Sequence, residues 1–243
     1  KKLNFINFKS DILYAIDLDG VIIDSINECF KVSLISYNSS FLRKNSKVKK
    51  YFFKYRGLVN PAYEYYYLMC SIEQYLMGDL KKIPTIFNML KAHDENKKAL
   101  QFERIFFKNR KELSDTNFHD WINLNPLTSF GVHLKNHQLI NFIIITTKNS
   151  ESAKKILDYY KITPKRIYGS NDVKNYGSKG KLLNAILNES TDSNMIFIDD
   201  SLDHLDSVNN KKIQCFFADW GYGKQLNDKF KTFSIWGVIW ILV

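Results

Sequence analysis

Short apolar runs mark the parts of the chain that we expect to form strands. Four runs are rich in Ile and Phe, and they cover Ile12–Asp17, Leu139–Thr146, Met195–Asp199 and Ile213–Phe217. A weaker fifth run covers Arg166–Gly169. Runs of this kind are typical of strands that are buried on both faces of a parallel sheet.

Segments with apolar residues at helical spacing separate the later runs. One apolar helix face would contain Ala153, Ile156, Leu157 and Tyr160, and another would contain Leu182, Leu183, Ile186 and Leu187. Ser150 and Ser178 stand at the starts of these segments, and a Ser at such a place favours a helix N-cap. The alternation predicts an α/β fold with a Rossmann-like, three-layer core, in which helices cover both faces of a parallel sheet.

A long helical segment separates the first run from the others. Helical patterns occur at Ile26–Tyr37, Ala62–Met77, Ile83–Lys91 and Asn96–Leu113, with no convincing pair of strands between them. Pro126 is a suitable point for the chain to return to the sheet. We therefore expect an α/β core made of residues 1–24 and 126–243, and an all-helical domain of residues 25–125 inserted after the first core strand.

Composition narrows the class of protein. The chain has 243 residues, and its 35 Lys and Arg exceed its 25 Asp and Glu, so the net charge is +10. A chain of this length can bury a core without disulfides or structural metals, and 45% hydrophobic residues exclude wholesale disorder. Three widely spaced cysteines form neither a disulfide framework nor a zinc motif. A reducing compartment, and so a cytoplasmic location, is expected.

Neither end of the chain carries a membrane signal that we recognise. The apolar run Phe233–Val243 has about half the roughly 20 residues that a spanning helix needs. Lys1–Phe8 is too short and too polar for a signal peptide. We expect no membrane span. The missing initiator Met and the apolar C-terminus also raise the hypothesis of a domain of, or partner to, a larger biosynthetic enzyme.

Polar side chains follow three of the four strong runs, at the point where each strand would end. They are Asp17, Asp19, Thr146, Thr147, Asp199 and Asp200. The carboxyl ends of parallel strands meet at one edge of a sheet, where ligands of such folds bind. Four clustered carboxylates repel one another unless a cation neutralises them, and oxygen ligands alone favour Mg²⁺. With Lys179 at a helix start and Thr146 as a donor, the set predicts phosphoryl transfer.

Four motifs resemble those of the haloacid dehalogenase-like (HAD) hydrolase superfamily, in the same order. They are Ile16–Val21, Ile143–Lys148, Gly177–Leu183 and Ile196–Asp203. Asp219–Gly223 also resembles the corresponding segment of phosphoglycolate phosphatase-like members. The resemblance covers residues 10–24 and 126–225, and it identifies the helical insertion as a C1 cap, which would close over the site and select the substrate.

The resemblance also implies residue roles. Asp17 would be the nucleophile that forms an aspartyl-phosphate, and Asp19 would be the general acid and base. Mg²⁺ would be bound by Asp17, by Asp200 and by the backbone carbonyl of Asp19, with Asp199 adjacent. The phosphoryl oxygens would be held by Thr146, Thr147 and Lys179.

The expected cap is basic and aromatic, and most of its Lys and Arg side chains favour an ordinary solvated surface. Arg56 differs because it begins a Gly- and Pro-containing segment, which we interpret as a loop. A guanidinium there could bind a second anionic group or stack on a ring, so Arg56 is our candidate substrate contact in the cap.

The sequence thus predicts a Mg²⁺-dependent phosphatase for a small phosphorylated metabolite, with a sugar or glycan phosphate as the expected substrate. A phosphomutase acting on a sugar phosphate would share Asp19 and remains an alternative. A different class, a polyanion- or nucleic-acid-binding module, is suggested by the net charge. No base-reading motif supports that alternative, so we expect no nucleic-acid partner.

Overall fold

The computed structural model describes residues 12–93, 97–137, 141–223 and 229–233, and it divides into two compact units. Lys1–Asp24 and Pro126–Val243 form the α/β unit, and Ser25–Asn125 form the helical unit. The chain leaves the α/β unit after Asp24 and returns to it at Pro126. These two residues are neighbours within that unit, because the Asp24 N–H donates to the Pro126 carbonyl at 2.8 Å. The expected terminal features at residues 1–8 and 234–243 lie outside the described residues.

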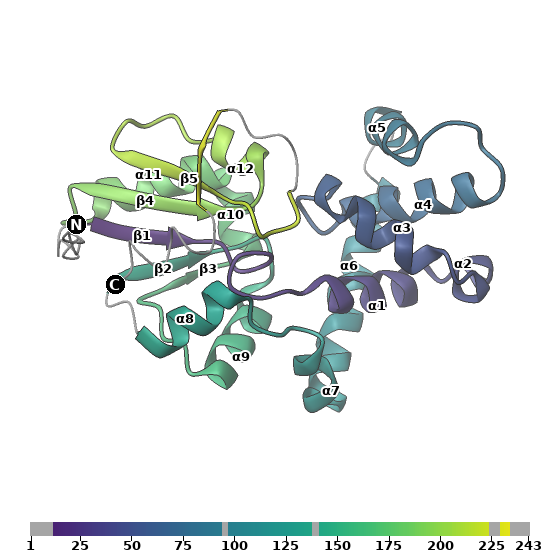
Figure 1. Cartoon of the computed structure of the whole chain (residues 1–243), viewed down its shortest axis with the longest axis horizontal. Coiled ribbons are helices and arrows are strands. Elements are labelled where there is room, and N and C mark those ends of the chain that lie inside the picture. Colours follow the sequence, from purple (N-terminus) through teal and green to yellow (C-terminus); the bar gives the residue numbers. More distant parts are fainter. Residues whose placement is uncertain (1–11, 94–96, 138–140, 224–228, 234–243) are drawn as a thin grey trace, which may run out of the picture. The chain divides into compact units, whose positions relative to one another are not determined.

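The α/β unit is built on a parallel sheet of six strands in the order β3-β2-β1-β4-β5-β6 (Figure 1). Its strands are β1 (Ile12–Ile16), β2 (Phe142–Ile145), β3 (Ile167–Tyr168), β4 (Asn194–Asp199), β5 (Ile213–Ala218) and β6 (Lys231–Phe233). The predicted parallel α/β core is confirmed, and β6 is an additional strand. β1 lies between β2 and β4, so Ile16 is in register with both Ile144 and Ile198.

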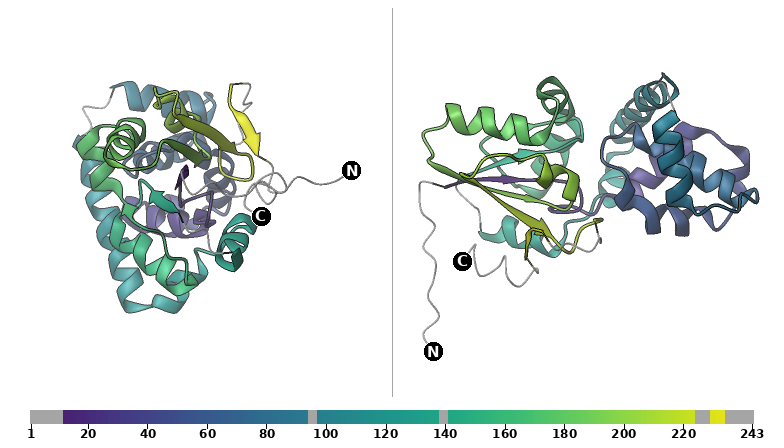
Figure 2. Two further views of the ribbon diagram at one scale, coloured as in Figure 1. Left: turned by 90° about the vertical axis from the view of Figure 1, so that its left-hand side faces the viewer. Right: turned by 90° about the horizontal axis from the view of Figure 1, so that it is seen from above.

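Helices cover both faces of this sheet. They are α8 (Ser129–His137), α9 (Ser150–Tyr160), α10 (Ser170–Tyr176), α11 (Lys179–Glu189) and α12 (Leu202–Asp206). α11 and α12 contribute to one apolar cluster with the strands, and α8 lies on the opposite side of the sheet (Figure 2). Ser178 caps α11 as predicted, since its Oγ accepts from the Lys181 N–H at 3.2 Å. The predicted Ser150 cap is wrong, because Asn149 is the N-cap residue and Ser150 begins α9.

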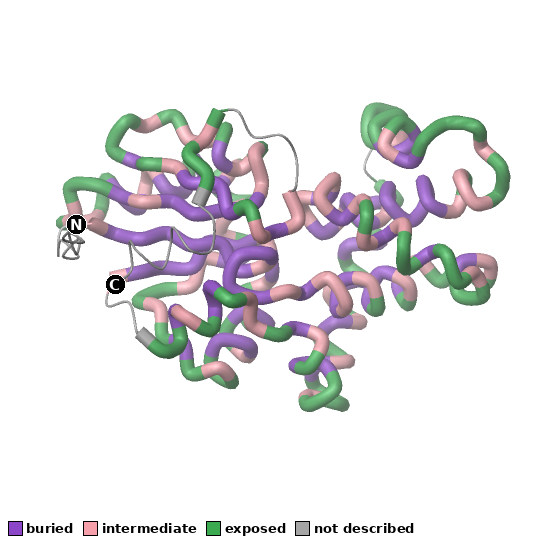
Figure 3. The backbone as a smooth tube through the Cα atoms, viewed as in Figure 1, coloured by how far each residue is buried: buried purple, intermediate pink, exposed green. Residues whose placement is uncertain are grey.

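The helical unit has a core of its own, which is rich in aromatic rings. Its helices are α1 (Ile26–Tyr37), α2 (Ser40–Lys44), α3 (Val48–Tyr55), α4 (Glu64–Leu76), α5 (Ile83–His93), α6 (Lys97–Thr116) and α7 (Phe118–Asn123). The Tyr65 ring stacks between Phe52 and Phe106, with centroids 5.6 and 5.2 Å away. Figure 3 shows buried positions along the helices of this unit as well as along the strands of the sheet.

A buried ion pair fastens the start of the helical unit to its end. The Arg110 side chain on α6 donates to both carboxylate oxygens of Glu28 on α1, at 2.6 and 2.9 Å. The Trp121 indole on α7 also donates to Glu28, at 3.4 Å.

Among the residues that the structure describes, no helix has the length and hydropathy needed to cross a bilayer.

Candidate active site

Asp17 and Asp19 lie in a tight turn that begins where β1 ends. The Asp17 N–H donates to the Ile198 carbonyl of β4 at 2.9 Å, which holds Asp17 at the carboxyl edge of the sheet. The Gly20 N–H donates back to the Ile23 carbonyl at 2.8 Å. Gly20 has a φ of +85°, a conformation that glycine adopts without strain. The turn therefore fixes the backbone on which both carboxylates stand.

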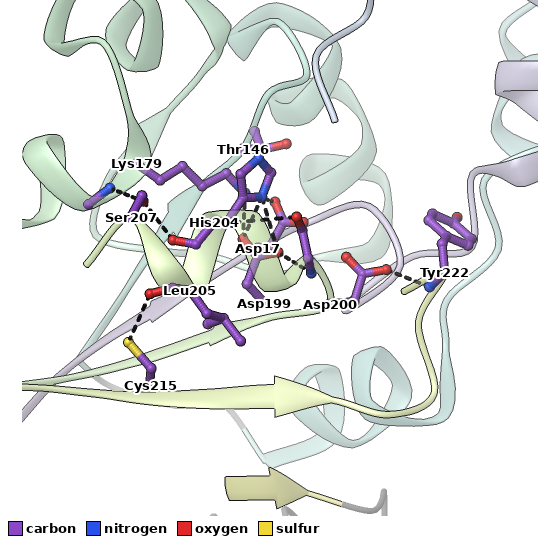
Figure 4. Close-up of polar contacts among 12 residues, drawn as sticks. Asp17, Thr146, Lys179, Asp199, Asp200, His204, Leu205, Ser207, Cys215 and Tyr222 are labelled. Atoms are coloured by element: carbon purple, nitrogen blue, oxygen red, sulfur yellow. Dashed lines mark hydrogen bonds and ion pairs between the residues drawn. The ribbon is translucent and has the colours of Figure 1, made fainter. Parts of the chain in front are cut away.

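β4 brings a second pair of acids to the same edge. Asp199 is its last residue and Asp200 follows, and both are buried together with Asp17. One carboxylate oxygen from each of these three residues lies within 4.8 Å of the other two (Figure 4). The structure thus brings together three of the four acids that the sequence analysis selected.

Lys179 lies between two of these acids. Its Nζ is 2.8 Å from Asp17 Oδ1 and 2.7 Å from Asp199 Oδ2, and its side chain is wholly inaccessible to solvent. The capping of α11 by Ser178 fixes the helix start from which Lys179 projects. One ammonium group is therefore shared by two buried carboxylates.

Burial and charge shift the proton affinities of this group. Burial raises the pKa of Asp17 to about 6, although Lys179 opposes the shift. Burial also opposes ionisation of Asp199, but Lys179 and His204 outweigh it and hold the pKa of Asp199 well below its usual range. For Lys179, the two carboxylates outweigh burial and raise its pKa. Asp17 is therefore the acid of this group that takes up a proton most readily.

His204 is a neighbour of Asp199, although its place directly after Asp203 in the sequence had favoured a role on a helix surface. Its Nδ1 lies 3.1 Å from Oδ2 and 3.2 Å from Oδ1 of Asp199. The Ser201 N–H also donates to Asp199 Oδ1, at 2.8 Å. The only signal in the sequence is the position of the histidine, two residues after the start of the helix that follows the acid pair.

Lys148 is a second residue that the sequence analysis did not select. It was noted only as the end of the second motif, yet its Nζ lies 3.1 Å from Asp19 Oδ1 and its side chain is wholly buried. The signal was its position directly after Thr146 and Thr147, at a strand end. Asp19 therefore pairs with a different lysine from the one that serves Asp17.

Thr146 and Thr147 follow β2 at the same edge of the sheet. Thr146 is completely buried, and its Oγ1 accepts from the Lys148 N–H at 3.1 Å. Thr147 is half-buried. α9 begins three residues after Thr147, so its first N–H groups also lie near this edge. Both threonines thus follow the strand end at the edge of the sheet that carries the acids, and their contact with a phosphoryl group stays a prediction.

Glycine backbone surrounds Asp200. A Cβ added to Gly20, Gly221 or Gly223 would lie 2.3, 2.2 or 1.9 Å from an atom of Asp200, so each of these positions accepts only glycine. The Tyr222 N–H donates to Asp200 Oδ2 at 2.5 Å, and its hydroxyl donates to Asp24 Oδ1 at 3.0 Å. The Asp219–Gly223 segment therefore holds Asp200 in one orientation.

Arg56 belongs to the helical unit and is buried there. Its guanidinium lies over the Tyr65 ring, 5.1 Å from the centroid, and its NH1 donates to the Val59 carbonyl at 2.7 Å. The predicted loop is wrong at this point, because Arg56–Leu58 form a short 3₁₀ helix. Arg56 thus packs inside its own unit, and a contact with substrate stays a prediction.

Comparisons by sequence find no relatives of this chain. No protein-family model matches it, and no curated protein matches it. Solved structures, in contrast, match over nearly the whole chain. This chain has the HAD fold.

Three solved structures show the extent of the match. A haloacid dehalogenase-like hydrolase, SP0104 from Streptococcus pneumoniae, is 20% identical with a TM-score of 0.57, and the match covers 95% of this chain and 98% of that one. A predicted phosphatase from Clostridium acetobutylicum is 18% identical with a TM-score of 0.54, over 93% and 96%. Protein tyrosine kinase A from Mycobacterium tuberculosis is 16% identical with a TM-score of 0.63, over 97% and 99%. Identities this low establish the fold, and the names differ in activity, so the reaction must be argued from the site.

Proposed function

We propose that this chain is a Mg²⁺-dependent phosphatase that hydrolyses a small phosphorylated metabolite, a sugar or glycan phosphate, through an aspartyl-phosphate. The observation that carries the proposal is the buried group of Asp17, Lys179 and Asp199 at the carboxyl edge of a HAD-fold sheet. In this group, a carboxylate with an adjacent cation lies at the edge where open α/β sheets bind their ligands.

The donor set fits a magnesium ion. Asp17, Asp199 and Asp200 are buried with oxygens within 4.8 Å of one another, and a hard divalent cation suits clustered carboxylate oxygens. Asp199 accepts hydrogen bonds at both oxygens from Ser201 and Lys179, which favours Asp17 and Asp200 as the direct ligands. The backbone carbonyl of Asp19 is the third ligand that we propose. Bound Mg²⁺ would withdraw charge from the phosphoryl oxygens and neutralise it.

Two carboxylates would carry the covalent steps. In the first, a carboxylate oxygen of Asp17 bonds to phosphorus, the bond from phosphorus to the ester oxygen breaks, and Asp19 gives its proton to that oxygen. In the second, Asp19 takes a proton from water, the water oxygen bonds to phosphorus, and the bond from phosphorus to Asp17 breaks. Lys179 and Thr146 would stabilise the phosphoryl oxygens in both steps.

The helical unit would act as the substrate-selecting cap of this enzyme. It occupies the chain between the first and second motifs, the position of a C1 cap in the resemblance described above. Its closure would exclude water during transfer, and its opening would release product. Arg56 remains its candidate substrate contact, and a change in its packing on Tyr65 would be required.

The decisive experiment measures phosphate release from p-nitrophenyl phosphate. We expect Asp17→Asn to abolish activity and EDTA to remove it reversibly, whereas Asp158→Asn, a matched change at an exposed acid of α9, should have no effect. Activity that survives Asp17→Asn or EDTA would contradict the proposal. A panel of sugar phosphates, nucleotides and phosphoglycolate would then identify the substrate class, and retention of phosphate on the product would indicate a mutase.

A further inference from the structure

Among the residues of the site that the structure describes, Lys148 is the one buried cation to which the proposed reaction assigns no role. Its side chain is wholly inaccessible to solvent, whereas the side chain of its partner Asp19 is 13% exposed. Burying an ammonium group is costly unless a charged partner compensates it. Asp19 is the charged partner that compensates the burial of Lys148, and it is also the proposed general acid and base of the reaction.

The backbone of Lys148 is held from two sides. Its N–H donates to Thr146 Oγ1 at 3.1 Å, and its carbonyl accepts from the Ser170 N–H at 3.0 Å. Thr146 is in turn fixed to the neighbouring strand, because its own N–H donates to the Tyr168 carbonyl at 2.9 Å. The long side chain of Lys148 therefore starts from a rigid point, and its ammonium group can serve as a fixed reference for the carboxylate that it contacts.

The two lysines of the site divide the acids between them. Lys179 contacts Asp17 and Asp199, at 2.8 and 2.7 Å, whereas Lys148 contacts Asp19 at 3.1 Å. A carboxylate can turn about two side-chain torsions even on a fixed backbone. An ammonium group paired with Oδ1 at 3.1 Å restricts that rotation, which would leave Oδ2 to face the reacting oxygen.

We infer that Lys148 is a positioning residue that holds the Asp19 carboxylate in the orientation needed for proton transfer to the leaving group. This inference rests on the proposed phosphatase function and adds a residue to it. Lys148 makes and breaks no bond itself. Asp19 still gives the proton to the ester oxygen as the bond from phosphorus to that oxygen breaks, and Lys148 sets where that proton is presented.

A comparison of two leaving groups tests the inference. p-Nitrophenolate departs as a stable anion and needs little help from an acid, whereas an alkoxide needs a proton as it leaves. We therefore propose to measure kcat/KM for p-nitrophenyl phosphate and for the best alkyl phosphate of the panel, because this parameter reports the steps up to loss of the leaving group. A misplacement of about 1 Å can cost about 100-fold in rate.

The expected result is a selective loss. Lys148→Met should lower kcat/KM for the alkyl phosphate by about 10- to 100-fold and for the aryl phosphate by less than about threefold. Asp19→Asn should be at least as selective, and the double variant should be no slower than Asp19→Asn alone, because Lys148 acts through Asp19. Lys211→Met, which removes an exposed lysine of the same unit, should change neither substrate.

Three outcomes would overturn the inference. One is an equal loss on both esters, which is the signature of a merely structural role. Another is a double variant whose losses multiply, which would mean that Lys148 acts independently of Asp19. The third is a parent protein that hydrolyses neither ester, which would overturn the proposed function as well. If Asp17→Asn is inactive while the leaving-group ratio is unchanged in Lys148→Met, only the inference on Lys148 fails. Should Lys148→Met not fold, Lys148→Gln carries the same comparison.

Discussion

Removal of the buried Lys179 ammonium group should destabilise the protein in a manner that depends on pH. Lys179→Met keeps the apolar stem but removes the charge that lies 2.8 Å from Asp17 and 2.7 Å from Asp199. Breaking a buried ion pair by deleting one partner costs about 3–5 kcal/mol. The free energy of unfolding at pH 8 should therefore fall by about that amount.

Protonation should reduce this loss at low pH. The pKa of Asp17 is already raised to about 6 by burial, and it rises further once the opposing lysine is gone. The folded variant then binds a proton that the unfolded chain, with an ordinary aspartate pKa, does not bind between about pH 5 and 8. Its stability must therefore decrease as the pH rises through this window. Each unit by which the pKa of Asp17 rises above its wild-type value makes the loss at pH 5 about 1.4 kcal/mol smaller than the loss at pH 8.

Urea unfolding at pH 5 and pH 8 measures both values. Lys181→Met is the matched control, because Lys181 lies on the same helix with an exposed side chain, and a surface change of this kind shifts stability by about 0.5 kcal/mol or less. The two units can unfold separately, so the transition must coincide by two probes before a free energy is extracted. An equal loss at both pH values, or a loss no larger than that of the control, would show that Lys179 does not compensate the buried charge of Asp17.

Three further predictions concern the same edge of the sheet. Gly221→Ala would place a Cβ 2.2 Å from the Cβ of Asp200, so calorimetry should record at least about tenfold weaker Mg²⁺ binding. An unchanged Mg²⁺ affinity would contradict Asp200 as a ligand. The rise in Tm on adding Mg²⁺ should shrink as the pH falls through about 6, because the raised pKa of Asp17 lets protons compete with the ion. An equal rise in Tm at pH 8 and pH 5 would count against Asp17 as a ligand. His204→Phe removes the ring nitrogen that lies 3.1 Å from Asp199, and it should lower kcat/KM by about tenfold with little change in Tm. Full activity of this variant would show that the contact between His204 and Asp199 does not support the reaction.

The strands of the core were predictable because their burial leaves a simple pattern. β1, β2, β4 and β5 are covered on both faces, so nearly every residue in them is apolar, and their runs stand out. β6 carries only Lys231–Phe233 at the edge of the sheet and has no such run. Edge strands are half-exposed and short, so their sequences resemble loops.

Helices were predictable where they are long. α1 was predicted with the bounds that the structure has, whereas α2 and α3, with five and eight residues, were missed. These short helices contribute few buried residues, such as Leu42, Val48 and Phe52, and their exposed lysines dominate the pattern. A period of 3.6 residues needs several turns before it can be distinguished from chance.

Some residues of the candidate site could be predicted from the sequence and others could not. Asp17, Asp199 and Asp200 could be predicted because they stand at the carboxyl ends of predicted strands. These ends meet at one edge of a parallel sheet. Lys148 and His204 reach their carboxylates through long or rotatable side chains, whose directions are decided by packing that a sequence does not display. Their partners could therefore be found only from the three-dimensional structure.

The position of the helical unit within the chain has a consequence for folding order. β1, a central strand of the sheet, pairs with β2 and β4, yet the whole helical unit separates it from both along the chain. Closing so long a loop costs conformational entropy before any strand contact repays it. The Glu28–Arg110 pair and the Trp121 contact fasten the two ends of the helical unit together, so that unit, once folded, acts as a short connection. We expect the helical unit to form first, and variants that loosen it should slow assembly of a sheet that they do not touch.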